Sequence, residues 1–314
     1  MAFLMGAFVN QLGIRDTVAA GPGISMATVE AVGEVREGPR ARVSALLVFL
    51  VLAFALSWYP WAIALMQHQT SGPNPLGVLV AALIASAVAG GWRGPLHLLL
   101  SMVRVRVRPS LWLAAFGIPI VIVAVALVAA KLWGLGVTFR APNWSDLFDR
   151  FVFTLGFVAV GEEPGWRGFL QPLLQRWLHP ILATLAVAVV WAVWHLPLMG
   201  NEFAWPMVPA FLASLLGGAF VLAWLYNSSS GPLPVPWLHA EVRWIYQGTR
   251  GSVLLPALMH ATLNTVSAGY AMQMVSAAGL AGFWWLYAGL WLAAALITVI
   301  ATRGRLGVAR AAAV

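Results

Sequence analysis

Long apolar segments recur along this chain, and they constrain its fold more than any other feature. A helix that crosses a bilayer needs roughly 20 mostly apolar residues. The candidate segments are residues 43–66, 75–92, 110–133, 147–177, 180–198, 207–226, 252–273 and 281–302. Because 61% of the chain is hydrophobic and only 9% is charged, the sequence predicts an all-α, polytopic membrane protein with about eight transmembrane helices.

Basic residues predict the orientation of these helices, because loops rich in Arg and Lys stay in the cytosol. With a cytosolic N-terminus, the outside segments carry only Lys131, Arg140 and Arg150. The inside segments then carry Arg40, Arg42, Arg93, Arg104, Arg106, Arg108, Arg176, Arg243, Arg250, Arg303, Arg305 and Arg310. We therefore expect both termini to be cytosolic.

The ends of the chain differ from its middle. Residues 1–40 are mixed in composition with scattered charge, and we interpret them as a polar, poorly ordered tail. Residues 41–305 form the expected membrane domain, and residues 306–314 form a short C-terminal tail. The chain has no cysteine, which excludes disulfides and thiolate chemistry. No basic soluble domain is visible, so a nucleic-acid partner is not expected.

Glu162 and Glu163 lie where a bilayer tolerates charge least, directly after the apolar stretch 151–161. A carboxylate at that depth costs several kcal/mol unless it is paired or solvated, so such a pair is a functional candidate. On a helix, Glu163 and Arg167 are four apart with the acid first, the favourable order for an ion pair. Glu162 then points about 100° away from that pair. A buried structural triad of the three residues is the alternative interpretation.

Two histidines and an asparagine accompany the carboxylates. Glu162 lies 16 residues before a turn near Leu178 and His195 lies 17 residues after it, so an antiparallel hairpin would place them at similar depth. His260 and Asn264 are four apart and share a helix face. The alternatives are a satisfied core histidine at His195 and simple helix–helix packing through the H-x-x-x-N segment.

The order of three motifs resembles a known family. E-E-x-x-x-R at 162–167, W-x-x-x-H at 191–195 and H-x-x-x-N at 260–264 are similar to those of the CPBP intramembrane proteases. This family includes the glutamate-dependent CAAX prenyl endopeptidases and the bacterial Abi proteins. The resemblance runs from about residue 45 to residue 300.

The chain departs from the family pattern in two places. Trp191 stands where the eukaryotic branch usually has Phe. A Pro-rich insertion near 228–243 separates two similar elements, W-L-Y-N at 224–227 and W-I-Y-Q at 244–247, where the family normally has one. We expect the insertion to form a cytosolic loop beside the site.

The resemblance implies a membrane-embedded peptidase whose site opens to the cytosol and whose substrate is a membrane-associated peptide or protein. Glu162 and His195 would activate a water molecule, and His260 and Asn264 would donate hydrogen bonds to the tetrahedral oxyanion. No cofactor would be needed. The Trp-x-x-x-His motif and the composition favour a multi-pass protein of the bacterial cytoplasmic membrane.

Alternative functions remain open at this point. Glu162, His195 and His260 are an adequate ligand set for zinc in a metal-dependent protease, although two adjacent glutamates cannot both face one ion from a regular helix. In the metal-free version, Arg167 holds Glu163. A non-catalytic membrane scaffold or bacteriocin-immunity protein of the same family is a further alternative, which the complete set of polar residues disfavours. A transporter would show a repeated pair of broken helices, and no repeat is visible.

Overall fold

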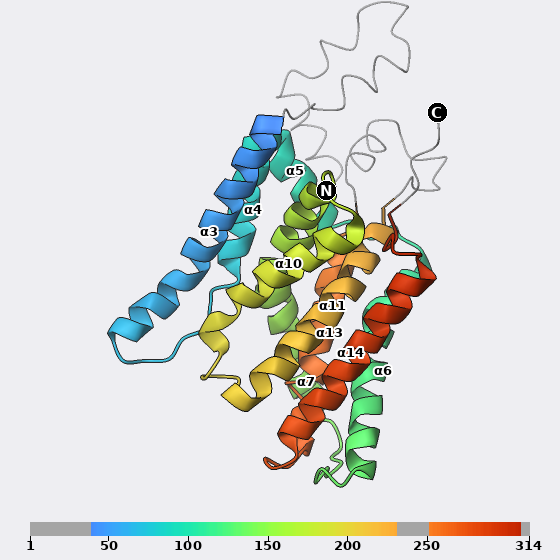
Figure 1. Ribbon diagram of the computed structural model, residues 1–314. Coiled ribbons are helices and arrows are strands. Elements are labelled where there is room, and N and C mark those ends of the chain that lie inside the picture. Colours follow the sequence, from blue (N-terminus) through green and yellow to red (C-terminus); the bar gives the residue numbers. More distant parts are fainter. Residues whose placement is uncertain (1–38, 231–250, 309–314) are drawn as a thin grey trace, which may run out of the picture. The chain divides into compact units, whose positions relative to one another are not determined.

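The computed structural model describes residues 39–230 and 251–308 (Figure 1). Within these ranges the secondary structure is helical, apart from an isolated bridge between Met199 and Phe203. The all-α prediction is therefore confirmed for this part of the chain. Nearly all of the predicted N-terminal tail lies outside the described residues. So do most of the insertion, the second W-I-Y-Q element and the last residues of the C-terminal tail.

Apolar helices make up most of the described chain. They are α3 (Pro39–Met66), α4 (Leu76–Gly90), α5 (Arg93–Met102), α6 (Pro109–Leu132), α10 (Pro180–Trp194), α11 (Val208–Ser228), α13 (Leu254–Val266) and α14 (Leu280–Ala301). Four helical stretches in the described residues are long and apolar enough to cross a membrane, namely Arg40–Met66, Pro109–Leu132, Trp205–Ser228 and Leu280–Ala301. Since α4 and α10 are shorter apolar helices, the total of eight spans stays a prediction.

The predicted overlong fourth span is a run of helical turns with changing pitch. In order, its parts are α7 (Trp144–Phe153), η1 (Thr154–Ala159), α8 (Val160–Glu163), η2 (Pro164–Leu170) and α9 (Gln171–Leu174). Both η1 and η2 are π-helical, a wide turn that recurs at functional sites. Pro164 has no N–H to donate and begins η2 directly after Glu163. The carboxylate pair therefore lies between two wide turns.

Glycines let this broken helix approach α4 closely. A β-carbon at Gly161 would lie 2.8 Å from the backbone carbonyl carbon of Pro75, and one at Gly165 would collide with Val78. Small residues at helix interfaces permit this kind of backbone approach. On the same side, the rings of Phe49 and Trp166 pack edge to face at 5.7 Å. The carboxylate-bearing helix is thus fixed within the core.

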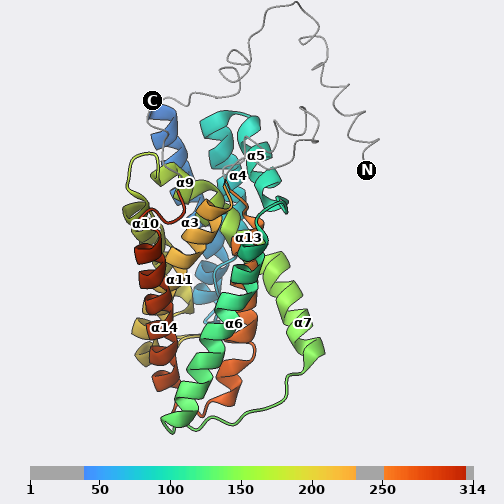
Figure 2. The same ribbon diagram turned by 90° about the vertical axis from the view of Figure 1, so that its right-hand side faces the viewer.

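Loops gather at the two ends of the helices (Figures 1 and 2). As oriented in Figure 1, the lower loop layer comprises residues 67–75, 133–143, 195–207 and 267–279, including short 3-10 turns. The upper loop layer comprises residues 91–108, with the short helix α5 between its loops, and residues 175–179 and 302–308.

Hydrogen bonds join segments that lie far apart in the sequence at each end of the helix bundle. In the lower loop layer the Thr138 N–H donates to the Met274 carbonyl at 2.8 Å. At the upper end, the Asn227 amide donates to the Leu306 carbonyl at 2.9 Å. There the Ser252 hydroxyl also donates to the Arg104 carbonyl at 2.7 Å. Each end of the helix bundle is therefore held together by its own hydrogen bonds.

Candidate active site

The predicted site residues meet at a cavity of about 470 Å³ beside α8. Four of the six line it: Glu162, His195, His260 and Asn264. The other two, Glu163 and Arg167, lie behind this wall and are completely buried. The structure therefore brings all six together and separates them into a cavity-lining group and a supporting pair.

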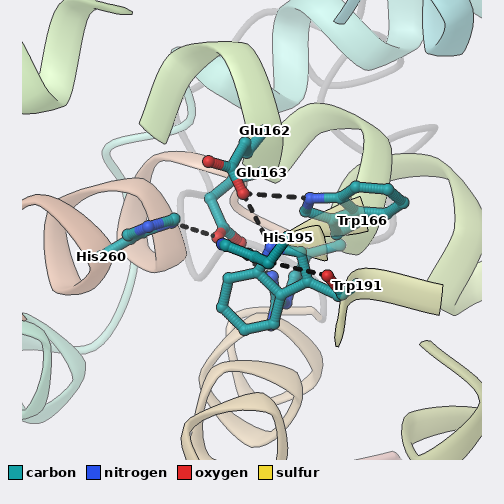
Figure 3. A network of polar contacts seen from close by, with 7 residues as sticks. Glu162, Glu163, Trp166, Trp191, His195 and His260 are labelled. Atoms are coloured by element: carbon teal, nitrogen blue, oxygen red, sulfur yellow. Dashed lines mark hydrogen bonds and ion pairs between the residues drawn. The ribbon is translucent and has the colours of Figure 1, made fainter. Parts of the chain in front are cut away.

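Glu163 connects two parts of the fold. Its Oε1 accepts a hydrogen bond from Arg167 Nη1 at 3.0 Å and one from His260 Nδ1 at 2.8 Å, the latter drawn in Figure 3. The predicted Glu163–Arg167 ion pair is confirmed in its geometry. Because a carboxylate at this contact accepts, Nδ1 of His260 carries the proton and Nε2 is the ring nitrogen that remains for a ligand.

Glu162 is held by indole groups. Its Oε2 accepts from Trp191 Nε1 at 2.7 Å and from Trp166 Nε1 at 3.3 Å (Figure 3). Within the described chain, Oε1 of Glu162 makes no hydrogen bond. The carboxylate is only 2% exposed and lines the cavity. One oxygen is therefore anchored, and the other is left for a bound water or substrate.

His195 follows the last turn of α10, and its ring is fixed by its own helix. Nδ1 lies 2.7 Å from the Trp191 carbonyl, which can only accept, so Nδ1 donates and the neutral ring keeps a lone pair on Nε2. The imidazole packs edge to face against Trp194 and Phe211, with centroid distances of 5.0 and 5.4 Å. This tautomer suits a group that accepts a proton or holds a water.

Trp191 contacts Glu162, His195, Arg167 and His260, which the sequence analysis did not predict. Besides its bonds to Glu162 and His195, its ring lies under the Arg167 guanidinium at 4.3 Å. It also meets the His260 ring edge to face at 5.7 Å. The available signal was that a buried indole N–H needs an acceptor. The sequence could not name that acceptor, because Trp191 and Glu162 are 29 residues apart.

Asn264 follows His260 by one turn of α13 and lines the cavity. Its side-chain amide has no hydrogen-bond partner within the described residues, so it can reach a ligand. The predicted metal ligands Glu162, His195 and His260 all border this cavity. Even so, no group of three His, Asp or Glu side chains in the described ranges is arranged to hold a metal ion.

The apolar helices and this buried polar cluster define a multi-pass membrane protein with a cavity-lining carboxylate and two histidines. Residues 143–242 match the model of the type II CAAX prenyl endopeptidase Rce1-like family. The match includes the E-E-x-x-x-R and W-x-x-x-H motifs. It confirms the predicted resemblance and supports placing the chain in the CPBP/CAAX protease family, whose members are generally proteases. His260 and Asn264 lie outside the matched segment. No curated protein matches the chain in sequence.

Proposed function

We propose that this protein is an intramembrane endopeptidase in which Glu162 and His195 activate a water molecule. The observation that carries the proposal is the arrangement of their polar atoms. Oε2 of Glu162 and Nδ1 of His195 are occupied by Trp191, while both side chains line one cavity. Oε1 of Glu162 and Nε2 of His195 are therefore the atoms that can hold a water, an arrangement that suits general-base catalysis.

The proposed reaction follows from these positions. Glu162 takes a proton as the water oxygen forms a bond to the peptide carbonyl carbon, and the carbonyl oxygen becomes an oxyanion. Asn264 and His260 donate hydrogen bonds to that oxyanion. One such donor is worth about 3–4 kcal/mol in soluble enzymes. The C–N bond then breaks, and the proton on Glu162 passes to the leaving amine.

The supporting pair has a separate role in this proposal. To donate from Nε2 while Nδ1 donates to Glu163, His260 needs a proton on both ring nitrogens. The Glu163 carboxylate at 2.8 Å balances that charge, and Arg167 at 3.0 Å balances the carboxylates in turn. Glu163 and Arg167 therefore position His260 and keep the net charge of the site tolerable.

Exchanging each glutamate for its amide tests this division of roles. We expect Glu162→Gln to abolish cleavage of membrane peptides, with abundance and thermal stability close to wild type. We expect Glu163→Gln to lower both activity and folded protein, because it leaves Arg167 buried without its charge partner. Breaking a buried pair costs about 3–5 kcal/mol. Comparative proteomics of membrane peptides, together with thermal unfolding in detergent, measures both effects. Equal stability losses in the two variants would contradict the division.

Two further outcomes would favour the alternatives. Activity that disappears on chelation and returns with zinc, with stoichiometric metal bound by wild type but not by His195→Ala, would make Glu162, His195 and His260 ligands of a metalloprotease. An identical peptide profile for wild type and a well-folded Glu162→Gln variant would favour a non-catalytic scaffold or bacteriocin-immunity protein. That version binds a membrane-associated partner without cutting it.

A further inference from the structure

The cavity wall carries a charged side chain that the proposed mechanism does not use. Glu202 lines the cavity and is exposed. Its carboxylate has no ion-pair or hydrogen-bond partner among the described residues. Oε1 of Glu202 lies 3.8 Å from the position that a β-carbon of Gly72 would take, and Gly72 lines the cavity as well. Glu202 therefore presents an unpaired carboxylate at the edge of the cavity.

Backbone hydrogen bonds fix the loop that carries this carboxylate. The N–H groups of Glu202 and Phe203 donate to the Leu198 carbonyl at 2.9 and 3.1 Å. The Gly200 N–H donates to the Phe203 carbonyl at 2.8 Å. Gly200 has a φ of +81°, a conformation that glycine adopts without steric cost. Since the loop begins directly after His195, it holds Glu202 in a defined place relative to the proposed catalytic ring.

Aromatic rings line the cavity next to Glu202, and we call them the aromatic wall: Phe203, Phe211 and Trp284. Phe203 and Phe211 stack at 4.1 Å, and Trp284 meets Phe203 edge to face at 5.6 Å. Phe211 also packs against the His195 ring at 5.4 Å. A substrate side chain that contacts the aromatic wall is therefore close to the scissile bond.

The other charges around the cavity are balanced by their neighbours. Arg150 lines the cavity, but its Nε donates to Asp146 on the same helix at 2.8 Å. In the proposed site, the two glutamates of α8 are balanced by Arg167 and a protonated His260. Glu202 is the charge that remains unbalanced among the described residues of the wall. Its field attracts a cationic group and repels an anionic one.

We propose that Glu202 and the aromatic wall form a subsite for a Lys or Arg side chain of the substrate, close to the scissile bond. Such a side chain packs its apolar stem against the rings and keeps its charged head in water beside the carboxylate. A cation near an aromatic face is stabilised further. An apolar side chain would gain nothing from Glu202. The inference rests on the proposed peptidase function and names a class of substrate for it.

Cleavage of matched peptides by the purified protein tests the subsite. The probe is a set of membrane-peptide sequences, each made with Lys, Met or Glu at one position near the scissile bond. Because an exposed ion pair contributes little, we expect wild type to cleave the best Lys peptide about two- to fivefold faster, in kcat/KM, than its Met counterpart. Glu202→Gln should cleave both equally, and Glu202→Lys should prefer the Glu peptide.

Asp149→Asn is the matched control for the loss of a negative charge. Asp149 is exposed on α7 at the same end of the bundle, and it is not among the residues that line the cavity. This variant should keep the wild-type preference for Lys. An unchanged preference in Glu202→Lys, or an equal loss in Asp149→Asn, would overturn the subsite.

Binding without cleavage separates the subsite from the peptidase assignment. In Glu162→Gln the proposed base is neutral, so a remaining preference for Lys in equilibrium peptide binding must come from another group. We expect that preference to persist in Glu162→Gln and to disappear when Glu202→Gln is added. This result would support the subsite even if no variant cleaved a peptide. Cleavage by wild type with no preference for Lys at any position would overturn the subsite and leave the peptidase function standing.

Discussion

Glu162 accepts its hydrogen bonds from two indole N–H groups. Its neighbour Glu163 accepts hydrogen bonds from Arg167 and His260. The two adjacent carboxylates thus have different surroundings. Glu163 is tied on one oxygen to a cation and an imidazole, which fixes it as a structural anion. The indole N–H groups hold the Glu162 carboxylate in place, and no cation is bonded to its oxygens. Glu162 is therefore able to accept a proton.

The Trp191 N–H can be removed while an aromatic ring is kept at this position. We expect Trp191→Phe to keep the stacking under Arg167 but to lose the bond to Glu162. A hydrogen bond to a charged group is worth about 1.5–3 kcal/mol, so kcat should fall about tenfold or more. KM and the folded yield should change little, because the lost bond positions the base and does not touch the substrate. Trp166→Phe, which loses the longer 3.3 Å bond, is the matched control and should have the smaller effect. An equal or larger loss of kcat in Trp166→Phe would count against Trp191 as the main positioning residue.

At the residue scale, the sequence predicted the Glu163–Arg167 contact within one helix and missed the contacts between helices. The Glu163–Arg167 pair follows from a spacing of four, so it could be predicted. The Glu163–His260 bond joins residues 97 positions apart, and its geometry depends on how α13 packs against α8. The same reason applies to Trp191, because no local pattern places its N–H beside Glu162.

At the scale of elements, apolar composition located the helices but overestimated the length of some. The segment 180–198 ends as a helix at Trp194, and 252–273 ends at Val266. The apolar residues that follow line the cavity or pack in the core, as do Leu198 and Ala271. A hydropathy window therefore reads them as helix. The π-helical pitch of η1 and η2 could not be predicted from the sequence, although Pro164 indicated an irregularity in this helix.

The close contact of the carboxylate-bearing helix with the Pro75 turn gives a test of this element. We expect Gly161→Ala to lower the thermal stability and folded yield, because the new β-carbon would lie 2.8 Å from the backbone of Pro75 and the helices would have to separate. Gly156→Ala lies in the same broken helix with open space around it. Ala is favoured over Gly in a helix by about 1 kcal/mol, so this control should be neutral or stabilising. Equal melting temperatures for the two variants would contradict a tight α4 contact.

At the scale of the whole molecule, the described surface carries large apolar side chains along entire helices. Val121 on α6 is 60% exposed and Ile297 on α14 is 65% exposed. Such continuous apolar surfaces are not left facing water in a soluble monomer. Together with the four candidate spans, they indicate that lipid covers these helix faces. The polar groups of the site are correspondingly turned inward.

A charge placed on this surface distinguishes lipid from water as its surroundings. Val121 lies near the middle of α6, whereas Leu132 is the last residue of that helix, next to Lys131, and is 80% exposed. On a water-exposed surface both Lys substitutions would be tolerated. In a bilayer, Lys at the centre of a span costs about 2.5–3.5 kcal/mol, while a Lys at the helix end extends to the interface. We therefore expect Val121→Lys to reduce the membrane-integrated, monodisperse protein recovered in mild detergent and Leu132→Lys to leave it unchanged. Wild-type recovery of Val121→Lys would show that this face of α6 does not contact lipid.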